Sequence, residues 1–338
     1  MKRHSKFFSL FVMALFIVAA LGGSALADSN LHFAFVTNVV ADFWSIAQVG
    51  VSHAERDFGV TAELHMPFDG SAAEQIRILE SMVAKQVDGI AVSAVDPTHM
   101  VDFLNGVAEQ TILITHDSDA PLSNRIAYIG TNNYKAGRRA GQVIQEILPD
   151  GGEIMIFVGK LDVQNAIERR QGIIDELRGE PDDKRFTESD PIGEVIAGNI
   201  TILDTLTDNV DMARAKQNVE DTLIRYPDVD CLVGLWSYNG PMMISAVGDA
   251  GLLGQIPMVT FDEEIEVLHA LQAGYVNATI VQDPYNFGYM SIKLMAQIAR
   301  GENPDIPEDG IIDVPARVIT PENVDAFWAD LREKLGQE

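Results

Sequence analysis

The sequence has a single cysteine, Cys231, so no disulfide can form within one chain. This cysteine lies in the apolar segment 231–234, and we interpret it as a buried structural thiol rather than a nucleophile. The seven histidines are scattered, with no pair at the spacing of metal ligands. The sequence also lacks the run of alternating oxygen-bearing residues that forms a calcium loop. We therefore predict no metal ion and no cofactor.

Positive charge is scarce as well. The chain has 24 lysines and arginines against 50 aspartates and glutamates, which gives a formal net charge of −26. An acidic surface repels nucleic acids and anionic lipids, so neither is expected as a partner. The same excess of negative charge favours a soluble protein, and we expect a monomer. Apolar residues nonetheless make up 47% of the chain, which is enough for two sizeable cores.

Long apolar runs are absent except at the start of the chain. Three basic residues stand among the first six, residues 7–21 are almost all apolar, and small residues follow at 25–27. This order is typical of a secretory signal peptide over residues 1–27, with cleavage before Asp28. An N-terminal membrane anchor is the alternative, but the apolar run is shorter than the roughly 20 residues that span a bilayer. We therefore expect an exported protein.

The remainder of the chain alternates short apolar segments with amphipathic helical patterns. Apolar segments without polar alternation predict parallel strands that helices cover on both faces. The length and the repeated pattern predict an α/β fold of two doubly wound, Rossmann-like lobes. The predicted strands are 31–37, 60–66, 89–92, 111–114, 126–129, 153–158, 192–201, 231–235, 258–261 and 278–281. The predicted helices are 42–58, 72–85, one beginning after 97, 133–148, 163–178, 212–225, 240–250, 265–271 and 324–335.

Ligands of such sheets bind beyond the carboxyl ends of the strands, so the residues after each strand are candidates for a binding site. Polar and aromatic side chains gather at these positions. They occur at 37–38, 43–44, 116–119, 236–239 and 262–264. We expect these segments to meet in one cleft between the two sheets.

In their order along the chain, several of these segments resemble the ribose-binding family of type I periplasmic binding proteins. Phe43 and Trp44 are similar to the paired aromatic residues of that family, and Asp117 is similar to its aspartate at a strand end. Arg169, in the segment 165–172, is similar to its helix arginine. The resemblance extends over nearly the whole chain after the predicted cleavage site.

Three further residues continue the resemblance. Asn239 matches an asparagine that follows a strand, Asp262 matches a second aspartate, and Gln282 matches a glutamine beside the hinge. The resemblance implies the substrate-binding component of an ABC sugar importer in the periplasm, which closes around a monosaccharide and delivers it to the permease. It implies binding without catalysis, and we expect no enzymatic activity.

The chain departs from the ribose-binding pattern at three places. Ala41 stands where those proteins carry an asparagine, Ser118 stands where they carry an arginine, and the segment 204–208 lacks their aromatic wall. Ser118 is kept as a candidate ligand residue. The candidates for compensating contacts are Asn38, Asn165 and Tyr238. The resemblance therefore leaves the ligand open among a pentose, a deoxy sugar, a hexose and a polyol.

The residue types suit a sugar independently of the family. Flat aromatic side chains cover the C–H faces of a sugar ring, which Phe43 and Trp44 could sandwich. Carboxylates accept from hydroxyls and a guanidinium donates in a fork, and such charge-assisted hydrogen bonds contribute about 1.5–3 kcal/mol each. The structural alternatives are that the aromatic pair belongs to the core, that Asp117 and Asp262 cap helices, and that Arg169 pairs with a carboxylate on a solvated face.

The resemblance also implies a three-segment hinge. The crossings between the lobes are expected near 130–132, 262–284 and 310–315. The N-terminal lobe then comprises residues 28–131 and 283–310, and the C-terminal lobe comprises 132–282 and 311–338. We expect Phe43, Trp44 and Asp117 on the first lobe, Arg169 and Asn239 on the second, and Asp262 and Gln282 at the hinge.

Three other functions fit parts of the pattern. Asp117 and Asp262 would suit the paired carboxylates of a glycosidase, but no nucleophile elbow, phosphate loop or metal cluster accompanies them in the sequence. A sugar or autoinducer sensor that docks on a chemoreceptor or kinase has the same fold and pocket, so the sequence leaves it open. A repressor effector domain shares the architecture, but the signal peptide and the missing DNA-binding segment argue against it.

Overall fold

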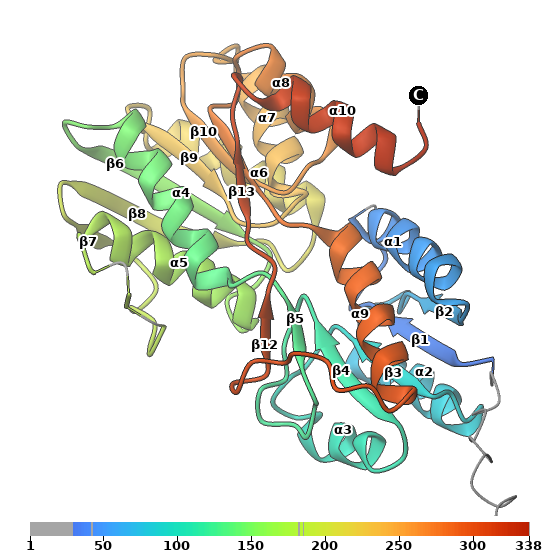
Figure 1. Cartoon of the computed structure of the whole chain (residues 1–338). Helices are drawn as coiled ribbons and strands as arrows, with labels where there is room; N and C mark the ends of the chain where they lie inside the picture. The colour runs from blue at the N-terminus through green and yellow to red at the C-terminus, as the bar shows by residue number, and fades with distance from the viewer. Residues whose placement is uncertain (1–29, 42, 182, 185, 338) are drawn as a thin grey trace, which may run out of the picture.

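The computed structural model describes residues 30–41, 43–181, 183–184 and 186–337. The predicted signal peptide and the cleavage site before Asp28 lie outside the described residues. Two sheets with helices on both faces form two lobes that lie next to each other (Figure 1). This confirms the predicted α/β fold of two doubly wound lobes. Among the described residues, no helix is both long and apolar enough to span a membrane.

The first lobe is built on a sheet of parallel strands in the order β12-β5-β4-β3-β1-β2. Its strands are β1 (His32–Val36), β2 (Thr61–His65), β3 (Gly89–Val92), β4 (Ile112–His116), β5 (Tyr128–Gly130) and β12 (Ile311–Asp313). Its helices are α1 (Phe43–Phe58), α2 (Ala72–Ala84), α3 (Val101–Ala108) and α9 (Pro284–Ala299). On β1, Phe33 and Phe35 share a core with α1 and α9, whereas Ala34 and Val36 share one with α2 and α3. Both faces are buried, which explains the continuous apolar runs in the sequence.

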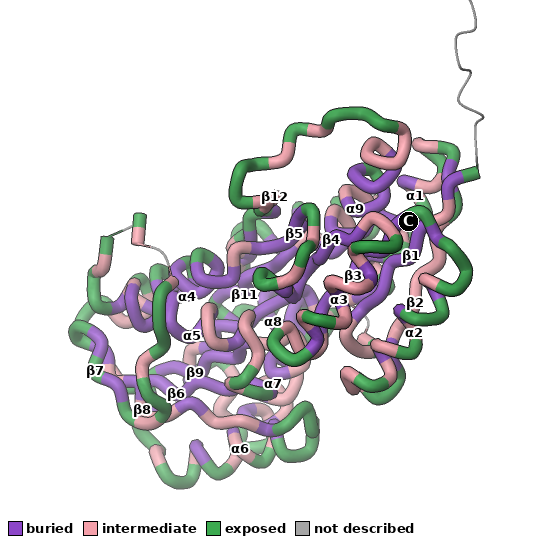
Figure 2. The backbone as a smooth tube through the Cα atoms, turned by 90° about the horizontal axis from the view of Figure 1, so that it is seen from below, coloured by how far each residue is buried: buried purple, intermediate pink, exposed green. Residues whose placement is uncertain are grey.

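The second lobe is built on a sheet in the order β13-β11-β10-β9-β6-β8-β7, in which the two edge strands β13 and β7 are antiparallel to their neighbours. Its strands are β6 (Gly152–Val158), β7 (Val195–Ala197), β8 (Ile200–Thr207), β9 (Cys231–Gly234), β10 (Met258–Phe261), β11 (Ala278–Val281) and β13 (Arg317–Ile319). The helices α4 (Asn133–Ile147) and α5 (Gln164–Leu177) cover one face. The other face is covered by α6 (Met212–Arg225), α7 (Asn239–Asp249), α8 (Ile265–Gln272) and α10 (Val324–Lys334). Figure 2 shows the buried strands of both sheets between helices that are partly exposed.

The segment 192–201, predicted as one strand, is a hairpin in the structure. The chain reverses at Gly198, whose φ of +64° lies in the left-handed region that glycine tolerates. A Cβ atom at this position would also lie 2.3 Å from the carbonyl oxygen of Leu177. The turn therefore requires glycine, and β7 and β8 pair as its antiparallel arms.

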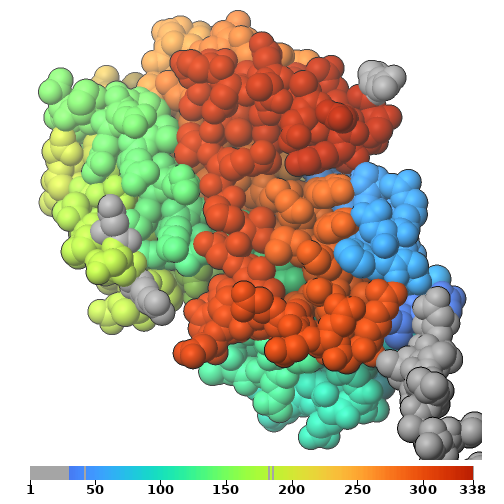
Figure 3. Space-filling model, in the orientation of Figure 1, coloured from blue at the N-terminus to red at the C-terminus, as the bar shows by residue number. Residues whose placement is uncertain are grey.

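The chain crosses between the sheets three times: from β5 to α4, from β11 to α9, and from β12 to β13. The third crossing corrects a predicted boundary. Residues 311–313, assigned from the sequence to the C-terminal lobe, pair as β12 with β5, from Ile311 opposite Tyr128 to Asp313 opposite Gly130. Backbone pairing with β5 holds this segment in the first sheet, so the third crossing lies at 314–316. In Figure 3 the C-terminal residues, in red, run over the surface from one lobe to the other.

Candidate ligand-binding cleft

Asp117 follows β4 and accepts hydrogen bonds from side chains at the ends of two other strands of the same sheet. Its Oδ2 accepts hydrogen bonds from Ser93 Oγ at 2.8 Å and from Asn38 Nδ2 at 3.3 Å. Ser93 follows β3 and Asn38 lies beyond the end of β1, so these contacts join strand ends within the first sheet. The φ of Asp117 is +54°, an uncommon conformation outside glycine that turns the chain sharply at the strand end.

Arg169 on α5 is the buried cation of the site, with only 2% of its surface exposed. Its Nε donates to Asn133 Oδ1 at 2.9 Å, its Nη1 donates to the carbonyl oxygen of Leu235 at 2.7 Å, and its Cζ lies 4.6 Å from the centre of the Phe261 ring. These two bonds use part of the five N–H donors of a guanidinium, which leaves donors for a ligand. The predicted alternative of an arginine on a solvated face is wrong.

Close packing of α4 on α5 fixes the position of Arg169. A Cβ atom on Gly137 of α4 would lie 2.1 Å from the carbonyl oxygen of Arg169, so only glycine allows this approach. Asn133, at the first position of α4, is carried to the guanidinium by the same packing. Sequence reasoning missed Asn133, although its place directly after the first crossing was a usable signal.

Asp262 follows β10 and forms the second acidic group of the site. Its φ is +66°, and its Oδ1 accepts a hydrogen bond from Gln282 Nε2 at 3.0 Å. Gln282 directly follows β11, so this pair lies beside the second crossing between the sheets. No side-chain capping bond from Asp262 to the following helix α8 is present among the described residues, and Glu264 occupies its N-cap position.

The two carboxyl groups and the guanidinium act on one another across the lobes. Burial raises the pKa of Asp117 to about 6, Arg169 opposes this rise, and the charge of Asp262 adds to it. Burial likewise raises the pKa of Asp262, again opposed by Arg169. Asp117 of the first lobe therefore lies within electrostatic reach of Arg169 and Asp262 of the second lobe.

A second polar group surrounds Asp208, which sequence reasoning missed. Asp208 directly follows β8, accepts from Tyr238 Oη at 2.6 Å and from Asn239 Nδ2 at 3.2 Å, and has a pKa raised by burial. Asn239 Oδ1 in turn accepts from the backbone N–H of Trp236 at 3.0 Å. Tyr238 and Asn239 thus meet at the end of β8, and the position of Asp208 after a strand could have identified it.

The turn after Asp208 has an unusual backbone. Asn209 and Val210 have φ values of +57° and +65°, and a positive φ is a genuine outlier for a β-branched residue such as valine. Asp208 Oδ1 accepts from the backbone N–H of Val210 at 2.8 Å and so holds the turn. Val210 remains 45% exposed. Strained turns of this kind gather at ligand-binding sites.

The remaining compensating candidate, Asn165, also contacts an aromatic side chain. Its Oδ1 accepts from Trp236 Nε1 at 3.2 Å, and the ring of Trp236 lies edge to face with Tyr238 at 6.3 Å. Asn165 is therefore joined through Trp236 to Tyr238, whose hydroxyl donates to Asp208. Ser118, by contrast, has a buried hydroxyl without a hydrogen-bond partner among the described residues.

The predicted aromatic sandwich is corrected for Trp44. Its side chain is 2% exposed and contacts Phe35 and His116 as well as Phe43, so it belongs to the core of the first lobe. Phe43 is half-buried and packs against Trp44 and Phe287. Adjacent residues on a helix point about 100° apart, so the pair cannot face the same surface. Phe43 alone keeps an accessible ring.

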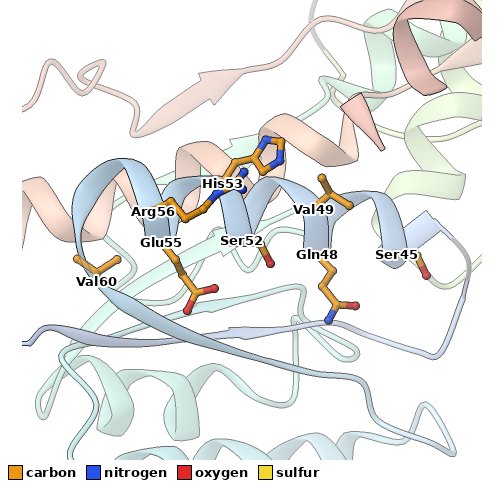
Figure 4. A pocket seen from close by; sticks show the side chains of 8 residues that line it. All are labelled: Ser45, Gln48, Val49, Ser52, His53, Glu55, Arg56 and Val60. Atoms are coloured by element: carbon orange, nitrogen blue, oxygen red, sulfur yellow. The ribbon is translucent and has the colours of Figure 1, made fainter. Parts of the chain in front are cut away.

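An open hollow on the surface of α1 is separate from these groups. Figure 4 shows its lining side chains, which come from α1 and the adjacent Val60 and include Gln48 and Glu55. None of the predicted ligand residues lines it, and no residue of the second lobe contributes. Among the described residues, no group of three or more histidine, cysteine or acidic side chains is arranged to hold a metal ion.

Comparisons with known proteins agree with the fold. Residues 33–303 match the sequence profile of a family described as the periplasmic binding protein domain. A D-ribose/D-allose-binding protein of Pseudomonas aeruginosa is 23% identical over 79% of this chain and 80% of its own length. The D-allose-binding periplasmic protein of Escherichia coli is 22% identical over 87% of this chain and 91% of its own length.

Two solved structures share both the fold and a quarter of the sequence. A glucose-galactose-binding protein from Geobacillus stearothermophilus superposes with a TM-score of 0.76 at 26% identity, covering 87% of this chain and 98% of that protein. An ABC transporter solute-binding protein from Burkholderia graminis, in complex with D-arabinose, superposes with a TM-score of 0.77 at 26% identity, covering 87% and 96%.

Proposed function

Because this chain belongs to the periplasmic binding protein family, we propose that it binds a small neutral monosaccharide between its two lobes and delivers it to an ABC importer. The observation that carries the proposal is that the buried Asp117 of the first lobe lies within electrostatic reach of Arg169 and Asp262 of the second. Proteins of this family bind solutes for transport, and the chain is not an enzyme.

The chemistry of the three charged groups favours a polyhydroxylated ligand. Buried carboxylates accept hydrogen bonds from hydroxyls, and the remaining N–H groups of Arg169 donate to hydroxyl or ring oxygens. An ionic ligand would add a charge to a site whose own charges already act on one another. A ligand that lacked one hydroxyl would leave a buried charged group unpaired, so the site should discriminate strongly among sugars.

Binding residues on both lobes imply a closing motion. A ligand that contacts Asp117 and Arg169 together favours the closed arrangement by its differential affinity for that arrangement, and the three chain crossings serve as the hinge. The closed form would be the one that the permease recognises. We propose a periplasmic location, which the family supports, and a monomer, which the strongly acidic composition supports.

The ligand class follows from the site and from the relatives. Relatives carry names for ribose, allose, arabinose, glucose and galactose binding. We propose a pentose, hexose, deoxy sugar or polyol, with Asn38, Asp117, Arg169 and Asp262 among the contacts and Phe43 covering one face of the ring. Tyr238 and Asn239, held by Asp208, would line the far side.

A thermal-shift screen against these sugars, followed by calorimetry, tests the proposal. A ligand at about one hundred times its Kd stabilises the folded state by about 2.7 kcal/mol, which raises Tm by several degrees. Asp117→Asn should abolish the shift, whereas Gln48→Ala on the outer surface of α1 should leave it unchanged. Stoichiometric binding without product formation supports a receptor. Turnover of the sugar, or no shift with any member of the panel, would contradict the proposal.

A further inference from the structure

A narrow cavity lies between the lobes at the second crossing, beside Asp262. It has room for about one water molecule. The first lobe contributes α1 and the start of α9 to its wall, and the second lobe contributes Glu263, Arg317 of β13 and Lys334 of α10. Gln282 lines the same cavity. The cavity therefore adjoins both the hinge and the proposed ligand contacts.

Two buried oxygen atoms in this wall have no hydrogen-bond partner among the described residues. They are Glu263 Oε2 and Gln282 Oε1. Glu263 is only 9% exposed. An ionised carboxylate and an amide oxygen are both acceptors, and each buried acceptor left without a donor costs about 1–3 kcal/mol. A single proton on Glu263 would turn one of the two acceptors into a donor and satisfy both.

We propose that Glu263 is a protonated carboxylic acid whose O–H donates to Gln282 Oε1, either directly or through one water in the cavity. This bond fixes the Gln282 amide with its Nε2 toward Asp262, to which it donates at 3.0 Å. Glu263 is thus a positioning residue for Asp262, one step behind the groups that touch the sugar. Its effect on affinity rests on the proposed sugar-binding function, whereas its protonation does not.

The surroundings of Glu263 favour the neutral form. Burial raises the pKa of Glu263 well above its ordinary value, and the charges of Asp262, Asp283 and Glu264 act in the same direction, while Arg317 opposes them. The other titratable groups that line the cavity are Tyr285 on α9 and Asp330 and Lys334 on α10. Burial raises the pKa of the Tyr285 phenol above its ordinary value, which favours its neutral form.

Ionisation of Glu263 should weaken sugar binding. An ionised Glu263 can only accept, so the Gln282 amide would turn its Nε2 toward Glu263 and release Asp262. Because the folded-state pKa of Glu263 is raised, the positioning bond is present below that pKa and is lost as pH rises through it. Sugar affinity should therefore decline on the alkaline side.

Two matched variants test this assignment. Glu263→Gln keeps the shape and supplies an N–H donor that cannot titrate, whereas Glu263→Leu removes the donor. We expect Glu263→Gln to bind sugar within about twofold of the wild type at neutral pH without the alkaline decline, and Glu263→Leu to bind about tenfold more weakly, as the loss of one hydrogen bond predicts. Urea unfolding of both variants checks that the fold is retained.

Infrared difference spectroscopy of the ligand-free proteins gives a readout that needs no sugar. The difference between the wild-type and Glu263→Gln spectra at neutral pH should contain the carbonyl stretch of one protonated carboxylic acid, because any contribution from Asp117 or Asp262 is common to both proteins. Absence of that difference band would overturn the proposal, as would an alkaline decline that persists unchanged in Glu263→Gln. If the wild type bound no sugar, the proposed function would fail while the band still decided the protonation of Glu263.

Discussion

Replacement of Arg169 by methionine should destabilise the protein in a way that depends on pH. The substitution keeps an unbranched side chain but removes the charge-assisted bonds to Asn133 Oδ1 and to the carbonyl oxygen of Leu235. At about 1.5–3 kcal/mol each, these bonds total about 3–6 kcal/mol, which agrees with the roughly 3–5 kcal/mol lost when one partner of a buried ion pair is removed. The free energy of unfolding at neutral pH should fall by about that much.

The pH dependence follows from the two carboxyl groups that Arg169 faces. Burial raises the pKa of Asp117, and with Arg169 opposing this rise the value is about 6; Arg169 opposes the burial-driven rise for Asp262 in the same way. Without the guanidinium both pKa values rise further, so the folded variant binds protons that the unfolded chain does not. Stability then increases as pH falls from the raised folded-state pKa toward the unfolded value near 4. The difference in unfolding free energy between the wild type and Arg169→Met should therefore be smaller at mildly acidic pH than at neutral pH.

Arg170→Met is the matched control. The Arg170 side chain is as buried as that of Arg169, and it donates hydrogen bonds to Thr205 Oγ1 and to two backbone carbonyl oxygens, which the variant loses. Asp117 and Asp262 are not among the charges that act on Arg170. Urea unfolding of the ligand-free proteins at neutral and mildly acidic pH compares the two variants, and calorimetry with the sugar found in the screen tests binding. Arg169→Met should lose binding and recover stability in acid, whereas Arg170→Met should do neither. If Arg169→Met lost the same free energy of unfolding at both pH values, the electrostatic coupling of Arg169 to Asp117 and Asp262 would be refuted.

Two further substitutions test single features of the fold. Burial lowers the pKa of His116 to about 3, so the unfolded state takes up the proton first and stability is lost as pH falls below about 6.5, by up to about 5 kcal/mol. His116→Leu should flatten this part of the stability profile in urea unfolding, and an unchanged acid slope would show that His116 is not its source. Val210→Gly should raise the free energy of unfolding by about 0.5–2 kcal/mol, because relief of the strain at positive φ exceeds the added chain entropy of glycine. A destabilised Val210→Gly variant would mean that the valine side chain packs usefully despite its exposure.

Local sequence patterns were sufficient to predict the two lobes and part of the candidate site. Apolar strands buried on both faces have a sequence signature that does not depend on distant contacts, so the alternation of strands and helices could be followed from β1 to β11. Ligands of such sheets bind beyond the carboxyl ends of the strands, which is why Asp117 and Asp262, each directly after a strand of its own sheet, could be predicted as ligand contacts from the sequence. Arg169 and Gln282 were reached only through the resemblance to known proteins.

Other features depended on contacts between distant segments. The segment 311–313 carries too short a pattern to predict a strand, and only pairing with β5 assigns it to the first lobe. Phe43 and Trp44 are adjacent aromatic residues, so the sequence does not distinguish which of them is buried. The packing of Trp44 against Phe35 and His116 assigns Trp44 to the core and leaves Phe43 at the accessible surface.

Asp208 and Glu263 show the same limit for polar groups. Asp208 is one of 50 acidic residues, and its role appears only when the end of β8 meets Tyr238 and Asn239. Glu263 acquires its environment from α1, α9 and α10, which come from both ends of the chain. The sequence by itself determined which segments form strands and helices, because hydrophobic periodicity is local. Tertiary structure alone decided which charges are buried together, because desolvation and pairing depend on neighbours far away along the chain.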